Sequence, residues 1–289
     1  MFKLLIIIFL FIISVENQNN FLEINKKNKE YRNNKSLLDV FENLKLKKRI
    51  REYPIFNAFQ ELVGYGSMID TVYSTTKNYL IDLSKNRVVE FDEKWHFKKH
   101  TFFNVPLHVV PVNQSIYVIG VKDIFKTDIY FNTIKRFQTY EDFLGAYYNS
   151  TSMTFLISAY AYKIYEFDLD LNIIDSIDTK DVHISSLQGY NNKLYAGDCT
   201  GNMHVIENKE IYLKYQICNS RNSRIQSILF DQQGYMALTC DYDGAAMLFY
   251  TNGTFTGMSI TNLKQPSDMG FDSKGNFILL GATEARIYN

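Results

Sequence analysis

The side chains that could carry binding or catalytic chemistry recur along this sequence at intervals of roughly 40 residues, near the ends of short apolar runs. Most are acids, joined by two histidines, one arginine and one tyrosine: Asp70, His108, Glu141, Asp142, Tyr160, His183, Arg224, Asp241 and Asp268. A mixed polar set of this kind could bind a peptide, a sugar or a metal ion. Ordinary solvated loops have the same composition, so the set predicts a surface and no particular reaction.

Metal chemistry is the narrower alternative. A calcium site needs several converging oxygen ligands, for which Asp70 and Asp268 are weak candidates, and a catalytic zinc needs about three histidines. Only His108 and His183 stand at suitable positions. The segment 241–244, Asp-Tyr-Asp-Gly, looks like part of a calcium loop but lacks the downstream Glu. We therefore predict no cofactor and no assigned metal site, with calcium as the alternative.

The elements that must position these side chains form a repeat. Six times a polar turn precedes a short aromatic or aliphatic strand, with anchors at Tyr79, Ile116, Phe155, Leu194, Tyr235 and Phe277, spaced 37, 39, 39, 41 and 42 residues apart. A second alternating run follows each anchor, with its own markers at Phe91, Phe131, Phe167, Ile206, Phe249 and Tyr288. A repeat of about 40 residues with four short strands is typical of a propeller blade.

We therefore predict an all-β fold, a six-bladed β-propeller over residues 53–289. The last repeat ends after its third strand, so a segment from residues 53–63 is expected to supply the missing outer strand and close the ring. A seven-bladed ring and a β-sandwich are the alternatives, but a sandwich does not require this period.

The last two repeats resemble a known family. Residues 265–278, Gln-Pro-Ser-Asp-Met-Gly-Phe-Asp-Ser-Lys-Gly-Asn-Phe-Ile, resemble the NHL repeat, in which an Asp-x-x-Gly turn joins the first two strands, and residues 225–235 are similar without the proline. The likeness covers residues 222–289, whereas the earlier repeats share only the period. It implies a binding platform, although some six-bladed propellers are calcium-dependent lactonases or zinc-dependent lyases.

The N-terminal residues have the layout of a secretory leader. Lys3 precedes ten apolar residues, 4–13, and a polar stretch follows, so we expect a signal peptide over residues 1–16 and no membrane-spanning helix after its removal. Residues 17–52 form a basic arm, and 21–52 hold ten Lys or Arg against five Asp or Glu. The whole chain has net charge zero, so composition favours no nucleic-acid partner.

Within this arm we expect one amphipathic helix of three to four turns. Leu37, Leu38, Phe41 and Leu44 are spaced for one helix face, and Ser36 is a candidate N-cap. The helix could pack on the propeller or remain a mobile arm. Lys47-Lys48-Arg49 could alternatively be a propeptide cleavage site.

The glycosylation acceptor sequences and the cysteines can be used to test the expectation that the protein is secreted. Acceptor sequences occur at Asn34, Asn113, Asn149 and Asn252, although the composition predicts about three by chance. The three cysteines exclude a disulfide framework. Cys199 and Cys240 each follow a strand anchor by five residues in neighbouring repeats, so free buried thiols, a Cys199–Cys240 bridge and a bridge to Cys218 are all open.

These observations together favour a secreted, extracellular binding module that recognises a protein, peptide or carbohydrate through one loop face. A metal-dependent hydrolase or lyase and a structural cell-surface protein are the alternatives.

Overall fold

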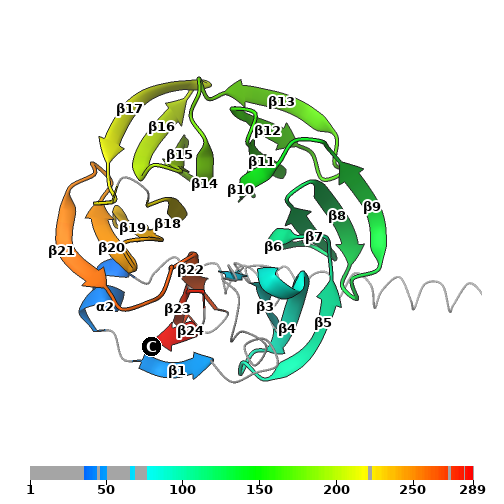
Figure 1. Ribbon diagram of the computed structural model, residues 1–289, viewed down its shortest axis with the longest axis horizontal. Coiled ribbons are helices and arrows are strands. Elements are labelled where there is room, and N and C mark those ends of the chain that lie inside the picture. Colours follow the sequence, from blue (N-terminus) through cyan, green and yellow to red (C-terminus); the bar gives the residue numbers. More distant parts are fainter. Residues whose placement is uncertain are drawn as a thin grey trace, which may run out of the picture.

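The computed structural model describes residues 36–43, 46–50, 66–68, 77–220, 223–272, 275–282 and 284–288. These residues form six four-stranded antiparallel sheets arranged as a ring around a central axis (Figure 1). In five sheets the strands follow one another in chain order from the axis outward, so each blade is a chain of hairpins. The protein is an all-β six-bladed propeller, as the repeat predicts.

Each blade has an inner, a second, a third and an outer strand. The inner strands are β2 (Gly66–Met68), β6 (Pro106–Val112), β10 (Phe143–Asn149), β14 (Ile184–Tyr190), β18 (Ile225–Phe230) and β22 (Asp268–Phe271). The second strands are β3 (Lys77–Asp82), β7 (Ser115–Gly120), β11 (Thr154–Ala159), β15 (Lys193–Asp198), β19 (Tyr235–Cys240) and β23 (Phe277–Leu280). The third strands are β4 (Arg87–Asp92), β8 (Asp123–Asp128), β12 (Lys163–Phe167), β16 (Asn202–Glu207), β20 (Ala245–Tyr250) and β24 (Ala285–Tyr288). The outer strands are β5 (Phe97–Phe102), β9 (Thr133–Gln138), β13 (Ile173–Asp178), β17 (Glu210–Gln216), β21 (Phe255–Ile260) and β1 (Leu46–Ile50).

The strand anchors of the sequence fall where the repeat places them, with one exception. All six first anchors lie in the second strands. The run 128–132 around the marker Phe131, expected to be a strand, instead forms the end of β8 and the turn after it. Asp128 accepts hydrogen bonds from the amides of Tyr130 and Asn132, which folds the chain back at this point.

Asparagine replaces glycine in many of these turns. Asn191 and Asn192 have φ of 47° and 59° between β14 and β15, the left-handed pair that a two-residue hairpin requires. Asn86 and Asn113 are also left-handed, at 50° and 55°. Asparagine tolerates this region better than other non-glycine residues, which explains how a fold rich in tight turns needs only 14 glycines.

The core lies between neighbouring blades. Second strands such as β7 and β15 are buried along nearly their whole length, whereas the outer strand β5 alternates between half-buried and exposed side chains. Aromatic rings fill the space between blades, as where Tyr117 packs on Phe155 with ring centroids 4.7 Å apart. This explains the high aromatic content, because each large ring contributes roughly 1.5–3 kcal/mol through burial.

The ring is closed by a strand from before the first blade. β1 pairs antiparallel with β24, from Leu46 opposite Tyr288 to Ile50 opposite Ala285, and so becomes the outer strand of the last blade (Figure 1). Closure by an N-terminal strand is therefore present, but the strand lies earlier than expected. The predicted segment 53–63 is outside the described residues, and Lys47-Lys48-Arg49 belongs to β1.

The predicted helix packs on the propeller and is shorter than expected. α2 (Leu37–Glu42) begins after Ser36, whose Oγ accepts the amide of Leu38. Leu37, Val40 and Phe41 are buried against β19, β20 and the last blade. The amide of Leu37 also donates to Asp231 Oδ2 at 2.7 Å in the β18–β19 turn. The helix therefore seals the gap between blades five and six; Leu44, expected in the same helix, is outside the described residues.

Candidate functional site

One face of the propeller gathers almost all the predicted site residues. In a blade built from consecutive hairpins, the turn between the second and third strands lies on the same face as the connection to the next blade. We call this the connector face and the other side the opposite face. His108, Glu141, Asp142, His183, Arg224 and Asp268 lie at or near blade entries, and Tyr160 and Asp241 lie in second-to-third-strand hairpins. Asp70 is outside the described residues.

Five of the six connector-face hairpins hold a buried carboxylate that is already paired with a basic side chain. In blades one, two and four the pairs are Asp82 with Arg87 (2.8 Å), Asp123 with Arg136 (2.8 Å) and Asp198 with His204 (2.9 Å). In blades five and six they are Asp241 with Arg224 (2.9 Å) and Glu284 with Arg286 (2.7 Å). All five acids are at most 4% exposed. The pairs fix hairpins to their own blades, since a buried charge without a partner is very costly.

The Asp198 pair shows why these acids are structural. Burial opposes ionisation of Asp198, but hydrogen bonds from His204 and from Asn202 outweigh it and hold the pKa well below its ordinary value. The amide of Thr200 donates to the same carboxylate. With its oxygens taken up inside the blade, Asp198 has little capacity left for a ligand.

Of the predicted site residues, Asp241, Arg224 and Asp268 have internal roles. Asp241 accepts hydrogen bonds from both the backbone amide and Nε of Arg224, at 2.7 and 2.9 Å, and so ties the entry of β18 to the β19–β20 hairpin. Asp268 accepts from Ser227 Oγ at 2.7 Å and thereby links the inner strands of blades five and six. The weak calcium candidate Asp268 therefore serves as an inter-blade contact.

His108 lies on the inner strand of blade two rather than among the loops. Its Nε2 is 3.4 Å from the carbonyl oxygen of Leu144 on the next inner strand. The ring keeps some exposed surface but is closely surrounded by protein, and burial lowers its pKa to about 4. At neutral pH His108 is therefore uncharged.

Blade three differs from the other five. Its hairpin, Tyr160-Ala161-Tyr162, has no acid, and the ring of His183 from the next blade entry stacks on both tyrosines. Its centroid lies 4.1 Å from that of Tyr160 and 4.3 Å from that of Tyr162, with interplanar angles of 21° and 25°. Two rings cannot occupy one imidazole face at these distances, so His183 lies between them. We call these three rings the aromatic stack.

Polar groups surround the stack. The amide of Tyr160 donates to the carbonyl of Asp142 at 2.7 Å, which places the β9–β10 connection beside the hairpin. The Asp142 side chain lies 3.4 Å from Lys122 Nζ, and both are about half exposed (49% and 51%). Glu141 accepts a hydrogen bond from the Tyr165 hydroxyl at 2.8 Å, and burial together with this bond raises the Tyr165 pKa to about 12. Four predicted residues, Glu141, Asp142, Tyr160 and His183, thus come together.

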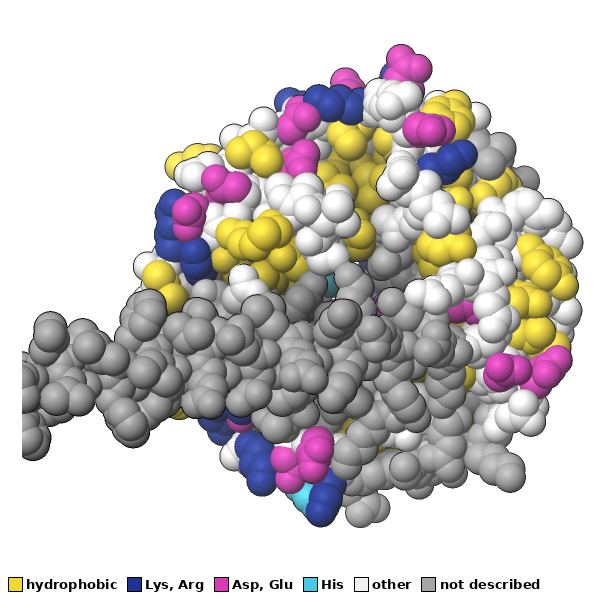
Figure 2. Space-filling model, turned by 180° about the vertical axis from the view of Figure 1, so that it is seen from behind, with side chains coloured by type: hydrophobic (Ala, Val, Ile, Leu, Met, Phe, Trp, Pro, Cys, Tyr) yellow, Lys and Arg dark blue, Asp and Glu magenta, His cyan; other side chains and the backbone are white. Residues whose placement is uncertain are grey.

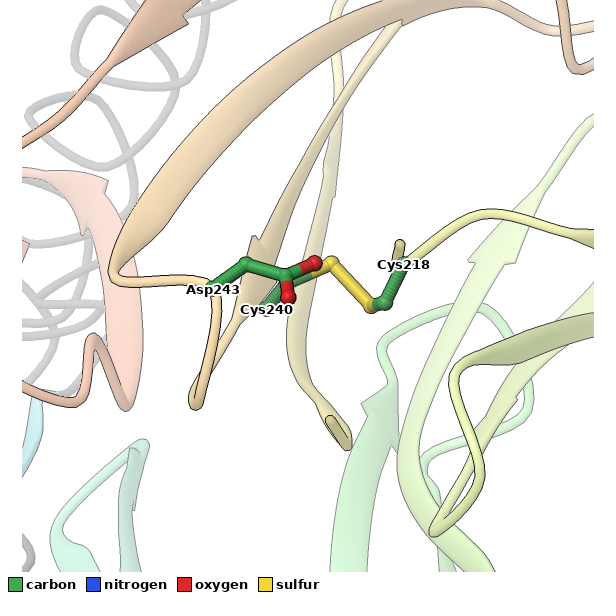
Figure 3. A group of neighbouring side chains, drawn as sticks. All are labelled: Cys218, Cys240 and Asp243. Atoms are coloured by element: carbon green, nitrogen blue, oxygen red, sulfur yellow. A yellow bond between two sulfur atoms is a disulfide. The ribbon is translucent and has the colours of Figure 1, made fainter. Parts of the chain in front are cut away.

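The cysteines pair differently from the Cys199–Cys240 bridge considered above. Cys218 and Cys240 form the disulfide (Figure 3). Cys199 is free. Cys240 pairs across its hairpin with Ile225, but the corresponding position in blade four, opposite Ile184, is Asp198 and not Cys199. A one-residue offset turns a side chain to the other face of a strand, so Cys199 and Cys240 are not equivalent.

Asp243 lies beside this disulfide (Figure 3). Cys218, Cys240 and Asp243 form the one cluster of at least three potential metal ligands found among the described residues. The sulfurs are bonded to each other, and the Asp243 carboxylate accepts the amides of Asn219 and Ser220 at 2.8 and 3.2 Å. Metal binding by cysteine requires thiolates. The disulfide and these hydrogen bonds therefore connect the segment after blade four to blade five.

The surface charges are mixed. On the face shown in Figure 2, basic and acidic side chains mostly stand next to one another around the rim instead of gathering by sign. Among the helices of the described residues, none is long and apolar enough to cross a membrane. The residues of the expected leader, 1–16, are outside that description.

Comparison with known proteins supports the fold alone. No family model matches the chain, and no curated protein matches its sequence. Among solved structures it resembles the WD40 domain of Pan2 from Neurospora crassa, with a TM-score of 0.64, 8% identity and coverage of 85% of this chain and 94% of that one. It also resembles a streptogramin B lyase, with a TM-score of 0.62, 10% identity and coverage of 85% and 97%. The chain thus shares the propeller fold with both structures.

Proposed function

We propose that this protein is an extracellular binding module of the NHL-like kind, which recognises a protein, peptide or glycan through its connector face. The observation that carries the proposal is the difference between blade three and the other five blades. Five hairpins direct a carboxylate inward to a basic partner, whereas the blade-three hairpin has no acid and presents Tyr160, which is 59% exposed and stacked on His183. Tyr242 in blade five is equally exposed, but its hairpin is fixed by the Asp241–Arg224 pair. A rigid aromatic side chain at a loop tip is a common anchor for recognition.

Three features support the extracellular part of the proposal. Residues 1–16 have the layout of a secretory leader. The Cys218–Cys240 disulfide is the kind of bond that persists in oxidising compartments. The turns at Asn113, Asn149 and Asn252 join first to second or third to fourth strands, so glycans there would lie on the opposite face and leave the connector face uncovered. Asn34 is outside the described residues.

The turns of the last two blades support the NHL-like assignment. Asp231 accepts the amides of Gln233 and Tyr235, and Asp272 accepts the amide of Asn276, which is the role that the Asp-x-x-Gly pattern assigns to the aspartate. The metal-dependent alternative gains little support within the described residues, because Glu141, Asp241 and Asp268 each accept hydrogen bonds from protein groups and Asp142 lies beside Lys122.

The proposal is tested by comparing capture by the wild type and by Tyr160→Ala on a glycan array and on an immobilised set of extracellular proteins. The matched control is Tyr130→Ala, which removes an exposed tyrosine from the β8–β9 turn on the opposite face. We expect ligands captured by the wild type and the control to be lost by Tyr160→Ala. Capture that Tyr160→Ala leaves unchanged would contradict recognition through the blade-three hairpin, and no capture at all would favour the structural cell-surface alternative.

A further inference from the structure

We infer that the aromatic stack is a carbohydrate site, in which the exposed ring of Tyr160 packs against the apolar face of a neutral pyranose unit. This rests on the proposed function and names its ligand class. The inference depends on three properties of the site: a rigid flat platform, adjacent donors and acceptors, and balanced local charge.

The platform is rigid because the stack holds it from below. His183 covers one face of the Tyr160 ring, so the 59% of the side chain that is exposed belongs to its other face and edge. Tyr162 supports His183 in turn at 4.3 Å. The C–H groups on one side of a pyranose form an apolar surface of about the size of a phenol ring, and a ring already fixed in place loses little conformational entropy on binding.

The groups beside the platform suit a polyol. The backbone carbonyl of Asp142 accepts a hydrogen bond from the amide of Tyr160, which holds Asp142 beside the ring. The Asp142 carboxylate can accept hydrogen bonds from a ligand, and the neighbouring Lys122 can donate them. Vicinal hydroxyls of a sugar can donate to such a carboxylate and accept from such an ammonium group at the same time. The two side chains are about half exposed and so are open to a ligand lying on the ring.

The charge around the stack argues for a neutral ligand. Asp142 is balanced by Lys122, and the Glu141 carboxylate accepts the Tyr165 hydroxyl. The exposed Asp181, two residues before His183, is preceded by the exposed Lys180. A site for a cation on aromatic rings would be favoured by acidic side chains that have no basic side chain beside them, which is not the arrangement here. A proline-rich peptide would need a groove with several open aromatic faces, whereas His183 and the half-buried Tyr162 leave Tyr160 as the open ring of the three.

The test uses saturation-transfer NMR on the full chain with separate small probes. The neutral probes are the methyl glycosides of glucose, galactose and mannose and N-acetylglucosamine; the competing probes are glucuronic acid, glucosamine and decaproline. We expect saturation transfer to at least one neutral probe, from its ring C–H protons, and at least tenfold weaker binding by Tyr160→Ala. Tyr160→Phe, which keeps the ring, should bind within about threefold of the wild type.

Tyr242→Ala is the matched control, because Tyr242 is also 59% exposed and lies in the connector-face hairpin of blade five. It should bind the neutral probe as the wild type does. The inference is overturned if no neutral sugar binds, if a charged sugar or decaproline binds more tightly, or if both alanine variants weaken binding equally. If no sugar binds but a protein is captured in a Tyr160-dependent way, the carbohydrate assignment is wrong and the proposed function still stands.

Discussion

Removal of the Cys218–Cys240 disulfide should lower the free energy of unfolding by about 3 kcal/mol. The bridge closes a segment with a sequence separation of 22 residues. With that length the chain-entropy relation gives a loss of about 11 cal/mol/K in the unfolded state, or about 3.4 kcal/mol at 25 °C. Both cysteines are fully buried and Asp243 separately holds the amides of Asn219 and Ser220, so the reduced blade should keep its native arrangement.

The measurement is urea unfolding of the wild type and of the Cys218→Ala/Cys240→Ala double variant, each with and without reductant, followed by circular dichroism. The wild type should lose stability on reduction, whereas the double variant should start lower and be insensitive to reductant. Cys199→Ala is the control and should behave as the wild type in both conditions. A reductant effect that disappears in Cys199→Ala would refute the pairing and the reasoning from strand register.

Two further predictions concern the inner strand of blade two and the N-terminal helix. Burial lowers the pKa of His108 in the folded protein to about 4. As the pH falls below about 6.5, His108 is therefore protonated in the unfolded chain before it is protonated in the folded protein. Stability should therefore decrease between pH 6.5 and 4, by at most about 3 kcal/mol. The difference in unfolding free energy between the wild type and His108→Gln, measured across this range, isolates that contribution, and a difference independent of pH would contradict it. Leu37→Ala should destabilise the protein by about 2–5 kcal/mol, since the Leu37 side chain of α2 is fully buried against blades five and six. Glu42→Ala, at an exposed position of the same helix, should change stability by less than about 0.5 kcal/mol, and equal effects of the two variants in thermal or urea unfolding would mean that the helix is not docked.

The propeller could be predicted from sequence because its signal is repeated. Each blade needs a buried second strand and a tight turn before it, and six copies of that pattern reveal a period even where single copies are ambiguous. The run 128–132 shows the limit, since its alternating apolar residues resemble a strand although Asp128 folds them into a turn. The closing strand was harder to place, because it occurs once. Leu46–Ile50 carries Lys47, Lys48 and Arg49, and nothing in its composition distinguishes it from a solvated basic arm.

Counting from strand anchors brought most of the candidate polar residues to one face of the propeller. It could not show which of the acids are engaged by internal partners. Arg136 belongs to a different strand from Asp123 and lies 13 residues away. The short spacing from Asp82 to Arg87 is a usable signal, since an acid that ends a second strand and a base that opens the third strand must meet across the hairpin. Glu284 instead directly precedes β24 and reaches Arg286 two residues further on.

The exception in blade three has a physical interpretation. A buried ion pair stabilises a hairpin only by occupying its hydrogen-bonding groups and hiding them from solvent. Stacked rings can hold a hairpin through contact alone, with about 0.5–1.5 kcal/mol for each ring pair beyond the area that it buries. Tyr160, His183 and Tyr162 therefore fix the hairpin to the next blade while leaving one ring and the Lys122–Asp142 pair open. Replacing the stack by an acid and an arginine would remove the exposed ring, so the proposed recognition requires the aromatic residues in this hairpin.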